Sequence, residues 1–453
     1  MLTNFLEHTR CPEELVEAFL AEYRATSATE PTSDEKKRPL ERIESLLSSL
    51  KDSARLQSGN GLKAGALRRT LEFDEAINDV RNERYVENLA ASGSPSTDQS
   101  LVRKFYYFLR PLFPVAFRKH LQRIALRGWD RIPFPSWPID LTTETLIEAT
   151  WELLLQSQER DELPFIWFWP EGHTSGCIMT HDVETAVGRD FCKTMMDMEN
   201  RRGIRSAFEV VPEVRYEVPP SYLQEIRDAG CEVCLHGLNH DGHLFSSESI
   251  FLERAKKIAA YARQWGAVGF RSPVMYRNLA WLPSLEFSYD MSVPNVAHLD
   301  PQRGGCCTVM PYFIGNLLEL PLTTTQDYTL FNILQQRSLD LWKKQIAMIR
   351  EKHGLISFII HPDYVTESWS TQIYDQLLGY LEELRANHGV WIALPKQIDT
   401  WWRARREMRL VRQDGAWQIV GPQAERARIA FASMQDGRIN YRVEKANPVA
   451  SVQ

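Results

Sequence analysis

The sequence predicts an α/β fold with a mainly parallel sheet, either open or closed into a barrel, and the residues at the strand ends favour the barrel. From residue 163 to about residue 404, short apolar segments of strand length alternate with longer segments of helical pattern. Strands that alternate with helices are typical of parallel sheets, because each parallel crossover needs a long connection. In four places a polar or charged residue follows directly after an apolar segment, as at barrel strands whose ends surround one site.

Two regions precede this barrel. Residues 1–100 contain helical patterns separated by polar segments, so we expect a helical, partly flexible N-terminal region. Residues 101–162 are rich in aromatic side chains with arginines interleaved. We expect this segment to be helical and to pack on the barrel, because a solvated or docking helical face is the commoner role of such a pattern. Contact with an anionic membrane or with a nucleotide-sugar phosphate is the alternative.

The barrel itself, residues 163–404, divides into strands and helices by the length and period of its apolar segments. Strands are expected at Phe165–Trp169, Gly176–Thr180, Ser206–Val211, Glu232–Leu235, Gly269–Arg271, Leu317–Leu320, Leu355–Ile360 and Val390–Ala393. Helices are expected at Val187–Arg202, Ser221–Ala229, Ser246–Trp265, Ser338–His353 and Trp369–Asn387.

Residues 405–453 have a different pattern, in which apolar and polar side chains alternate in short segments. Turn signals at Gln413–Gly415 and at Asp436–Gly437 separate these segments. Alternation of this kind suits a sheet that buries one face. The sequence therefore predicts a small antiparallel β unit at the C-terminus.

Composition limits the classes of function. The chain has 453 residues and a net charge of −6 without an obvious basic face, so nucleic acid is not expected as a partner. Its longest apolar runs have strand length, so no transmembrane segment is expected, and peripheral membrane contact stays open. The N-terminal segment lacks a cationic start followed by an apolar core, which predicts a cytoplasmic protein with reduced thiols.

The cysteine pair Cys231 and Cys234 does not indicate a metal or redox site. Only one residue separates Cys234 from His236, where a zinc finger needs about a dozen. The pair also falls within a predicted strand, whereas redox-active pairs lie at helix N-termini. We expect both sulfur atoms to pack in the core.

Two short motifs carry most of the information about function. Thr180–Glu184 follows the apolar run Cys177–Met179, and His236–His240 follows Cys231–Leu235. Polar residues at the ends of parallel strands converge on one edge of the sheet. Two neutral imidazoles and one carboxylate are a usual ligand set for a hydrolytic Zn²⁺. The sequence therefore predicts a metal-dependent hydrolase.

Each motif also has a purely structural interpretation. Asp182 and Glu184 could cap the helix that begins near Val187 and interact with its dipole. The spacing of His236 and His240 would put both imidazoles on one side of a helical turn, which suits one metal ion, but the structural interpretation is that an isolated pair of this kind is often incidental. The two motifs in combination favour a metal site.

Four short motifs occur in an order and at a spacing typical of one family: Thr180–Glu184, His236–His240, Gly269–Pro273 and Ile359–Pro362. Together they resemble the motif set of the polysaccharide deacetylase superfamily, also called the NodB-homology family, which includes the carbohydrate esterases that remove N-acetyl groups from sugars. The resemblance covers roughly residues 165–400. It implies a distorted (β/α) barrel and a single divalent metal ion, usually zinc.

The resemblance implies a ligand set for this metal. The commonest family pattern has two adjacent aspartates, of which the second binds the ion, but Val183 stands in that place here and cannot ligate. The chain is similar to the branch with a D-x-D pattern, in which the ligand lies one residue later. Glu184, His236 and His240 would then bind the metal.

The resemblance also implies the catalytic residues. Asp182 matches the catalytic base, Arg271 matches the arginine that holds this base through a charge-assisted fork, and His361 matches the general acid. Three further residues are candidates to contact the metal ligands or catalytic groups from outside the site: Asp290, Asp327 and His243. Asp327 is expected to orient His361, because a carboxylate partner fixes the tautomer of an imidazole.

From these residues we expect a metal-dependent hydrolase that removes an N-acetyl or other acyl group from an amino sugar in a glycan or glycan precursor. An amidohydrolase acting on a non-sugar amide or a cyclic ureide is one alternative. A catalytically silent scaffold or regulator is the other, because Val183 departs from the commonest motif. The sequence does not predict an oligomeric state.

Overall fold

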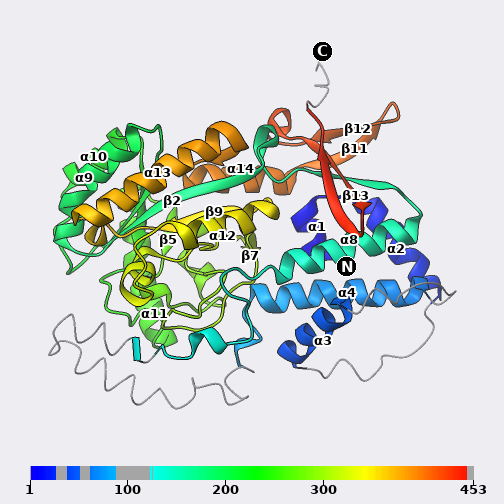
Figure 1. The fold of residues 1–453 in the computed structure, drawn as a ribbon, viewed down its shortest axis with the longest axis horizontal. Coiled ribbons are helices and arrows are strands. Elements are labelled where there is room, and N and C mark those ends of the chain that lie inside the picture. Colours follow the sequence, from blue (N-terminus) through cyan, green and yellow to red (C-terminus); the bar gives the residue numbers. More distant parts are fainter. Residues whose placement is uncertain (1, 27–37, 52–61, 88–122, 125, 446–453) are drawn as a thin grey trace. The chain divides into compact units, whose positions relative to one another are not determined.

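The computed structural model describes residues 2–26, 38–51, 62–87, 123, 124 and 126–445 (Figure 1). Parts of the two predicted N-terminal regions, including the aromatic and arginine-rich residues 101–122, lie outside the described residues. The chain divides into two compact units, one of residues 1–100, 141–172 and 401–453 and the other of residues 101–140 and 173–400. The domain boundaries predicted at residues 100, 162 and 404 stay predictions.

The second unit is built on one curled sheet with the strand order β10-β2-β3-β4-β5-β6-β8-β7, and β9 also pairs with β2. All neighbours are parallel except β7 and β8, which are antiparallel. The strands are β2 (Ser175–Val183), β3 (Ala207–Val210), β4 (Glu232–His236), β5 (Gly269–Arg271), β6 (Tyr289–Asp290), β7 (Tyr312–Ile314), β8 (Leu317–Glu319), β9 (Leu355–Ile359) and β10 (Val390–Ile392). The predicted distorted (β/α) barrel is confirmed.

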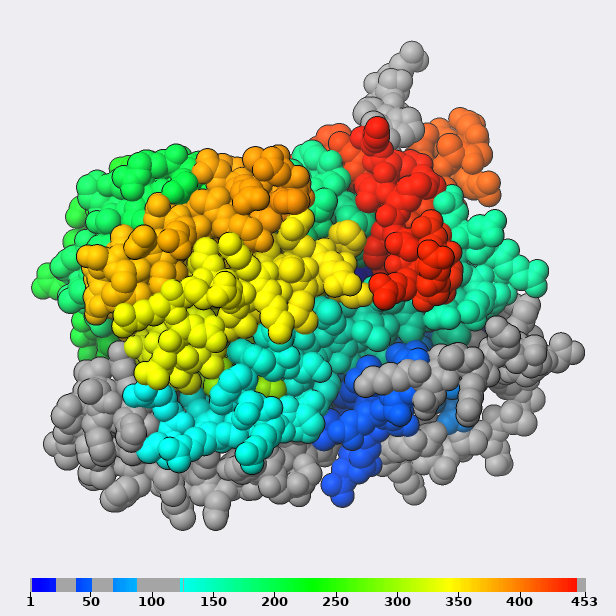
Figure 2. All heavy atoms as spheres, viewed as in Figure 1, coloured from blue at the N-terminus to red at the C-terminus, as the bar shows by residue number. Residues whose placement is uncertain are grey.

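Helices surround this sheet. They are α9 (Ala186–Asn200), α10 (Pro220–Asp228), α11 (Glu248–Trp265), α12 (Asp340–Glu351) and α13 (Ser368–His388). In the space-filling view, α12 and α13, in yellow and orange, form a continuous surface over one side of the unit (Figure 2). Because both faces of the sheet are covered, β2, β3 and β4 are buried along their whole length and lack the alternation of a half-exposed sheet.

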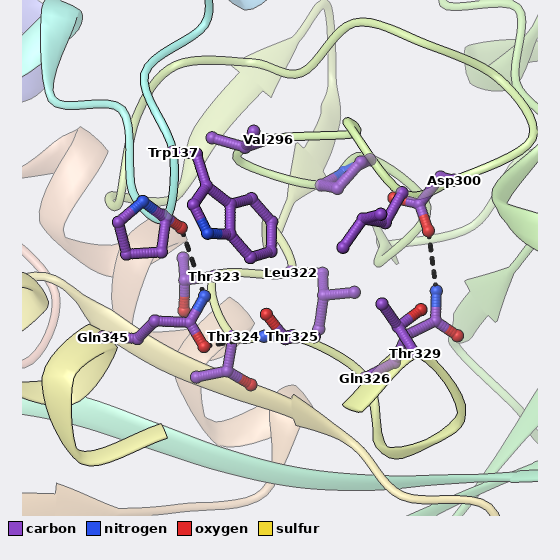
Figure 3. Close-up of a pocket in the computed structure, with 13 residues that line it drawn as sticks. Trp137, Val296, Asp300, Leu322, Thr323, Thr324, Thr325, Gln326, Thr329 and Gln345 are labelled. Atoms are coloured by element: carbon purple, nitrogen blue, oxygen red, sulfur yellow. Dashed lines mark hydrogen bonds between the residues drawn. The ribbon is translucent and has the colours of Figure 1, made fainter. Parts of the chain in front are cut away.

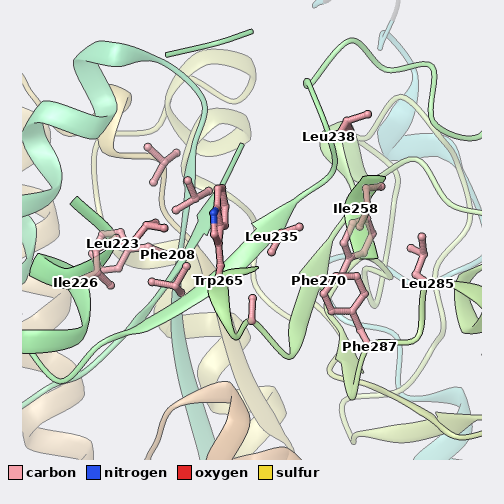
Figure 4. Close-up of a cluster of buried hydrophobic side chains, with 14 of the residues drawn as sticks. Phe208, Leu223, Ile226, Leu235, Leu238, Ile258, Trp265, Phe270, Leu285 and Phe287 are labelled. Carbon is pink, nitrogen blue, oxygen red and sulfur yellow. The ribbon is translucent and has the colours of Figure 1, made fainter. Parts of the chain in front are cut away.

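Along the strands, apolar side chains point toward the surrounding helices and polar side chains point into the barrel. Phe208, Leu235 and Phe270 lie in one core cluster with side chains from α10 and α11, including Leu223 and Ile258 (Figure 4). Successive side chains on a strand point to opposite faces. The neighbours of these apolar residues, which are Glu209, His236 and Arg271, therefore point to the other face, into the barrel.

The strands β8 and β9 are not paired with each other, and the segment after β8 is joined to β9 by the backbone bond from Thr324 N–H to the carbonyl of Ser357 at 3.2 Å and by side-chain bonds. Thr323 Oγ1 donates to the carbonyl of Leu355 at 2.7 Å and accepts the N–H of Ser357 at 2.9 Å. Thr324 Oγ1 donates to the carbonyl of Ser357 at 2.7 Å. These bonds hold the segment after β8 beside β9 and carry it toward Asp327.

The first unit combines helices with small antiparallel sheets. Its helices are α1 (Thr3–Thr9), α2 (Glu13–Thr26), α3 (Pro39–Lys51), α4 (Leu62–Arg81) and α8 (Thr142–Gln158). Its strands are β1 (Glu162–Ile166), β11 (Arg409–Gln413), β12 (Ala416–Val420), β13 (Ile429–Gln435) and β14 (Arg438–Val443). Strand β13 pairs with both β1 and β14, and β11 pairs with β12. Helix α14 (Pro395–Glu407) is shared by the two units.

Two of the predictions about elements are wrong. The strand expected at Phe165–Trp169 overlaps β1 (Glu162–Ile166) in two residues only, and β1 pairs antiparallel with β13 and is not part of the barrel sheet. A short apolar run fits any buried sheet, so its partner could not be inferred locally. His236 and His240 do not share a helical turn, because His236 ends β4 and His240 lies in the following loop.

All seven cysteines are free and buried, which agrees with the prediction of core thiols for Cys231 and Cys234. Within the described ranges, no helix combines the length and the apolar character needed to span a membrane.

Candidate metal centre

The first motif lies at the C-terminal end of β2, at the mouth of the barrel. Thr180 and Asp182 point into the barrel, and Val183 points into the apolar cluster on the opposite face. Glu184 follows the strand and is half-buried, with 20% of its side chain exposed. Thr185 then caps α9, since its hydroxyl accepts the N–H of Gly188 at 3.2 Å. The capping role belongs to Thr185, which leaves Asp182 and Glu184 available for other contacts.

Glu184, His236 and His240 bring three ligand atoms together, all within 4.8 Å of one another. Glu184 Oε1 lies 2.9 Å from His240 Nε2 and 3.9 Å from His236 Nε2. Two imidazole nitrogens and one carboxylate oxygen on one side of a site match the donor set that zinc prefers in hydrolases.

The environment of His236 fits a metal ligand. Its Nδ1 lies 3.2 Å from the carbonyl of Arg271, which can only accept, so Nδ1 carries the proton. Its Nε2 therefore presents a lone pair, and this buried atom has no hydrogen-bond partner among the described residues. A zinc-binding histidine usually donates the N–H of one ring nitrogen to a carbonyl or carboxylate and binds the ion through the lone pair of the other ring nitrogen.

Glu184 is ionised in this setting. Burial would raise the pKa of its carboxyl group, but the charge of His240, its hydrogen bond at 2.9 Å and the nearby His236 and His361 imidazoles lower this pKa well below its usual value. A carboxylate must be deprotonated to bind a metal ion, and this environment keeps Glu184 in that form.

Asp182 lies beside this cluster and is held by Arg271. Arg271 Nη1 donates to Asp182 Oδ1 at 2.6 Å and to Thr180 Oγ1 at 2.8 Å, and its Nε donates to the carbonyl of Met291 at 3.0 Å. The contact joins one nitrogen to one oxygen and is not the two-pronged fork expected from the sequence. Burial would raise the pKa of Asp182, but the charge of Arg271, with those of His236 and His361, lowers it.

His361 lies on the other side of the cluster, with its Nε2 3.6 Å from Glu184 Oε1. Asp327 accepts from His361 Nδ1 at 2.6 Å and from its backbone N–H at 2.8 Å. Burial would lower the pKa of His361, but the charge of Asp327 raises it well above its usual value. Asp327 therefore holds the imidazole in a fixed orientation with its proton retained, as a general acid requires.

Two predicted residues lie apart from this cluster. His243 is exposed, and its Nδ1 lies 3.3 Å from Ser246 Oγ. Asp290 is buried and accepts from the hydroxyl and the backbone N–H of Ser292 at 2.8 and 3.0 Å. Its register partner on β8 is Glu319, and burial raises the pKa values of both carboxyl groups. Its partners are therefore structural.

Three residues near the cluster were missed by sequence reasoning. Glu209 is fully buried, accepts the N–H of His181 at 3.0 Å, and lies 3.5 Å from Arg271 Nη1. Its signal was available, since an acidic residue in the middle of an apolar strand is unusual. Arg215 Nε and the Tyr216 hydroxyl donate at 2.8 and 2.7 Å to the carbonyls of Glu184 and Val183, in contacts that no local pattern indicates.

A separate pocket with an empty volume of about 360 Å³ lies beside the segment that leads to Asp327 (Figure 3). Its lining side chains bond to their surroundings: Gln326 donates to Asp300 at 2.9 Å, and Gln345 donates to the carbonyl of Pro138 at 3.2 Å. Neither the metal-binding candidates nor Asp182 and His361 line it. This pocket is therefore separate from the candidate site at the barrel mouth.

The fold is similar to that of polysaccharide deacetylases. A protein assigned as a polysaccharide deacetylase from Mycobacterium smegmatis is 19% identical with a TM-score of 0.43, and the match covers 53% of this chain and 94% of that one. PuuE allantoinase is 13% identical with a TM-score of 0.41, covering 52% and 92%. Peptidoglycan deacetylase PdaC from Bacillus subtilis is 13% identical with a TM-score of 0.34, covering 53% and 96%.

No protein-family model matches the sequence, and no curated protein matches it. With low identities and TM-scores below 0.5, the structural similarities carry no argument about activity. The function must be inferred from the side chains at the barrel mouth.

Proposed function

We propose that this protein is a metal-dependent hydrolase that removes an N-acyl group, such as acetyl, from an amino sugar in a glycan or glycan precursor. One observation carries the proposal. A cluster of ligand atoms within 4.8 Å of one another has an arginine-held carboxylate on one side and an aspartate-held imidazole on the other. Amide hydrolysis needs an activated water, a base and an acid in one place.

The metal-binding residues would be Glu184, His236 and His240. Zinc suits two nitrogen donors and one oxygen donor, and the bare Nε2 of His236 supports a bound cation. When bound, such a cation supplies a Lewis acid that polarises the acyl carbonyl and lowers the pKa of water toward ~7.

Asp182 would act as the base. Its Oδ1 is occupied by Arg271, whereas its Oδ2 lies 3.6 Å from His236 Nε2 and so faces the cluster. Oδ2 would take the proton of the attacking water. Arg271 would keep the carboxylate from rotating, and its charge would hold the carboxylate ionised before the reaction.

His361 would act as the acid. Its Nδ1 is engaged by Asp327, so the proton at Nε2 is the one directed toward the cluster. Nε2 would donate this proton to the sugar nitrogen as the C–N bond breaks, and the products would be the amine and a carboxylate. Without this donation, the tetrahedral intermediate would expel water and return to the amide.

The test is acetate release from N-acetylated sugars by the purified, zinc-loaded chain. We expect release that is abolished by a chelator and restored by zinc. Asp182→Asn should lower kcat by roughly 10²–10⁴-fold, the range over which a general base contributes. Full activity of this variant would overturn the assignment of the base.

The same assay should include cyclic ureides and simple amides, because the proposed chemistry would hydrolyse any suitably placed amide. Hydrolysis of a ureide without any acetate release from sugars would move the proposal to that substrate class. A zinc-loaded chain that hydrolyses neither would indicate a silent scaffold.

A further inference from the structure

The loop Gly237–His243, which contains His240, has an unusual backbone. His240 has a φ of 56°, in the left-handed region that residues other than glycine rarely adopt. Gly237 and Gly242 have φ values of 64° and 76°. A left-handed conformation costs a residue with a side chain on the order of 1–3 kcal/mol, so it persists only where surrounding contacts impose it.

Packing fixes the loop before His240. Leu238 is buried in the apolar cluster between the sheet and its helices, and the ring of Pro273 lies against Gly237. After His240, residues 241–243 are exposed or half-buried, and a small hollow lined by His240, Arg254 and Tyr276 among others lies beside them. The position of the chain after His240 therefore depends on hydrogen bonds and ion pairs.

Two anchors hold the loop on either side of His240. Before it, the carbonyl of Leu238 accepts the N–H of Glu213 at 2.9 Å. After it, Asp241 forms a two-pronged ion pair with Arg254 of α11, in which Nη1–Oδ1 and Nη2–Oδ2 are both 2.7 Å. Asp241 Oδ1 also accepts the N–H of His243 at 2.9 Å.

The Arg254–Asp241 pair is half-exposed, with 20% and 33% of the two side chains accessible. A pair of this kind contributes little to global stability. Its effect is local, because two parallel hydrogen bonds fix both the position and the orientation of the residue that follows His240.

We propose that Arg254 is a positioning residue for the metal centre, which acts through Asp241 to hold His240 in the orientation that binds the ion. This inference rests on the proposed metal-binding function. Residues behind a metal ligand typically contribute 10–100-fold to metal affinity. Arg254 contacts neither the ligand atoms nor the catalytic groups, so its effect should be on affinity and not on the chemistry.

The experiment measures the zinc affinity of the full chain by competition with a chromophoric chelator. We expect Arg254→Ala to weaken zinc binding about 10–100-fold. Arg254→Lys keeps one charged hydrogen bond and should lose only a few-fold. Asp241→Asn keeps the bond from the His243 N–H but loses the ion pair, so its affinity should fall between the two.

The matched control is Arg202→Ala. Arg202 also joins two carboxylates, Asp375 at 2.9 Å and Glu382 at 3.1 Å, with 28% of its side chain exposed, but it lies beyond the opposite end of α9 from Glu184. Its removal should leave the zinc affinity unchanged. At saturating zinc, the kcat of Arg254→Ala should return to within a few-fold of the unmodified chain.

The outcomes distinguish this inference from the proposed function. An unmodified chain that binds no divalent metal would overturn the proposed centre itself. A chain that binds zinc with equal affinity with and without the Arg254 side chain would overturn only the positioning role. Equal losses in the Arg254 and Arg202 variants would also overturn it, because they would reflect general destabilisation.

Discussion

Replacement of Arg271 by methionine should be among the most destabilising single changes in the barrel. Arg271 is fully buried, and its Nη1 lies 2.6 Å from Asp182 and 3.5 Å from Glu209. Methionine would fill much of the volume but would leave two carboxyl groups in the interior without their cation. Removing one partner of a buried ion pair costs about 3–5 kcal/mol, because the remaining charge is desolvated and unpaired.

A double variant tests whether charge is the cause. Arg271→Met combined with Asp182→Asn removes both members of the pair, and such paired removal costs far less than removal of one member. We expect the double variant to recover about 2 kcal/mol or more relative to Arg271→Met. Asp182→Asn alone supplies the fourth corner of the cycle.

The assay is urea unfolding in the presence of a chelator, followed by circular dichroism and tryptophan fluorescence. The chelator removes any contribution of bound metal to the free energy of unfolding. Additive losses in the two single variants, with no recovery in the double variant, would refute the account of Arg271 as the charge partner of Asp182. A loss below about 1 kcal/mol for Arg271→Met would refute it as well, since it would match only an exposed pair.

Three further predictions concern residues around the site. Asp327→Asn should lower kcat by about 10–100-fold with little change in KM, because His361 loses the carboxylate that orients it. Steady-state kinetics on an N-acetylated sugar measure both constants, and an unchanged kcat would contradict the role of Asp327. Burial raises the pKa of Glu232 to about 7, so the folded chain should lose up to about 3 kcal/mol of stability as pH rises from 4.5 through 7. In urea unfolding, Glu232→Gln should remove this loss at pH 8 and change the stability little at pH 4.5. Equal effects of the substitution at both pH values would contradict the reasoning. Gly237→Ala should weaken zinc binding at least tenfold. The φ of Gly237 is +64°, and the added carbon would lie 2.5 Å from the ring of Pro273. Unchanged affinity in a zinc titration would contradict this prediction and show that the loop adapts.

Much of the barrel could be predicted because its signals are local. Strand β5 was expected at the residues that form it, and β4 was expected to within one residue, because apolar runs bounded by glycine or polar residues leave few alternatives. The two-residue β6 and the three-residue β7 are too short to produce a period. Strand β1 was assigned to the wrong sheet because its partner β13 lies far away in the chain.

The candidate site was predictable where residues follow strand ends and unpredictable where loops decide the geometry. Asp182 and His236 lie on the barrel side of their strands because apolar neighbours occupy the other face. The left-handed backbone of His240 has no sequence signal, since glycine and not histidine marks such positions. The ion pair between Asp241 and Arg254 joins a loop to a helix and is equally invisible to local patterns.

The strands near the C-terminus show the same difference between local structure, which the sequence pattern predicts, and long-range pairing, which it does not. The alternation and the two turn signals after residue 408 predicted an antiparallel unit, and the structure has the antiparallel pairs β11–β12 and β13–β14 there, because a half-buried strand has a period of two. The same pattern did not indicate that β13 would also pair with β1. Pairing between distant segments depends on the whole chain and not on the pattern of either strand.

The most direct test of the central idea is the zinc content of the purified chain after metal loading and exhaustive dialysis, compared with that of the variant His236→Ala/His240→Ala. The account predicts one tightly bound zinc ion per chain and almost none in the double variant. It would be contradicted by a chain that retains no divalent metal, or by a double variant that still holds a full equivalent of zinc.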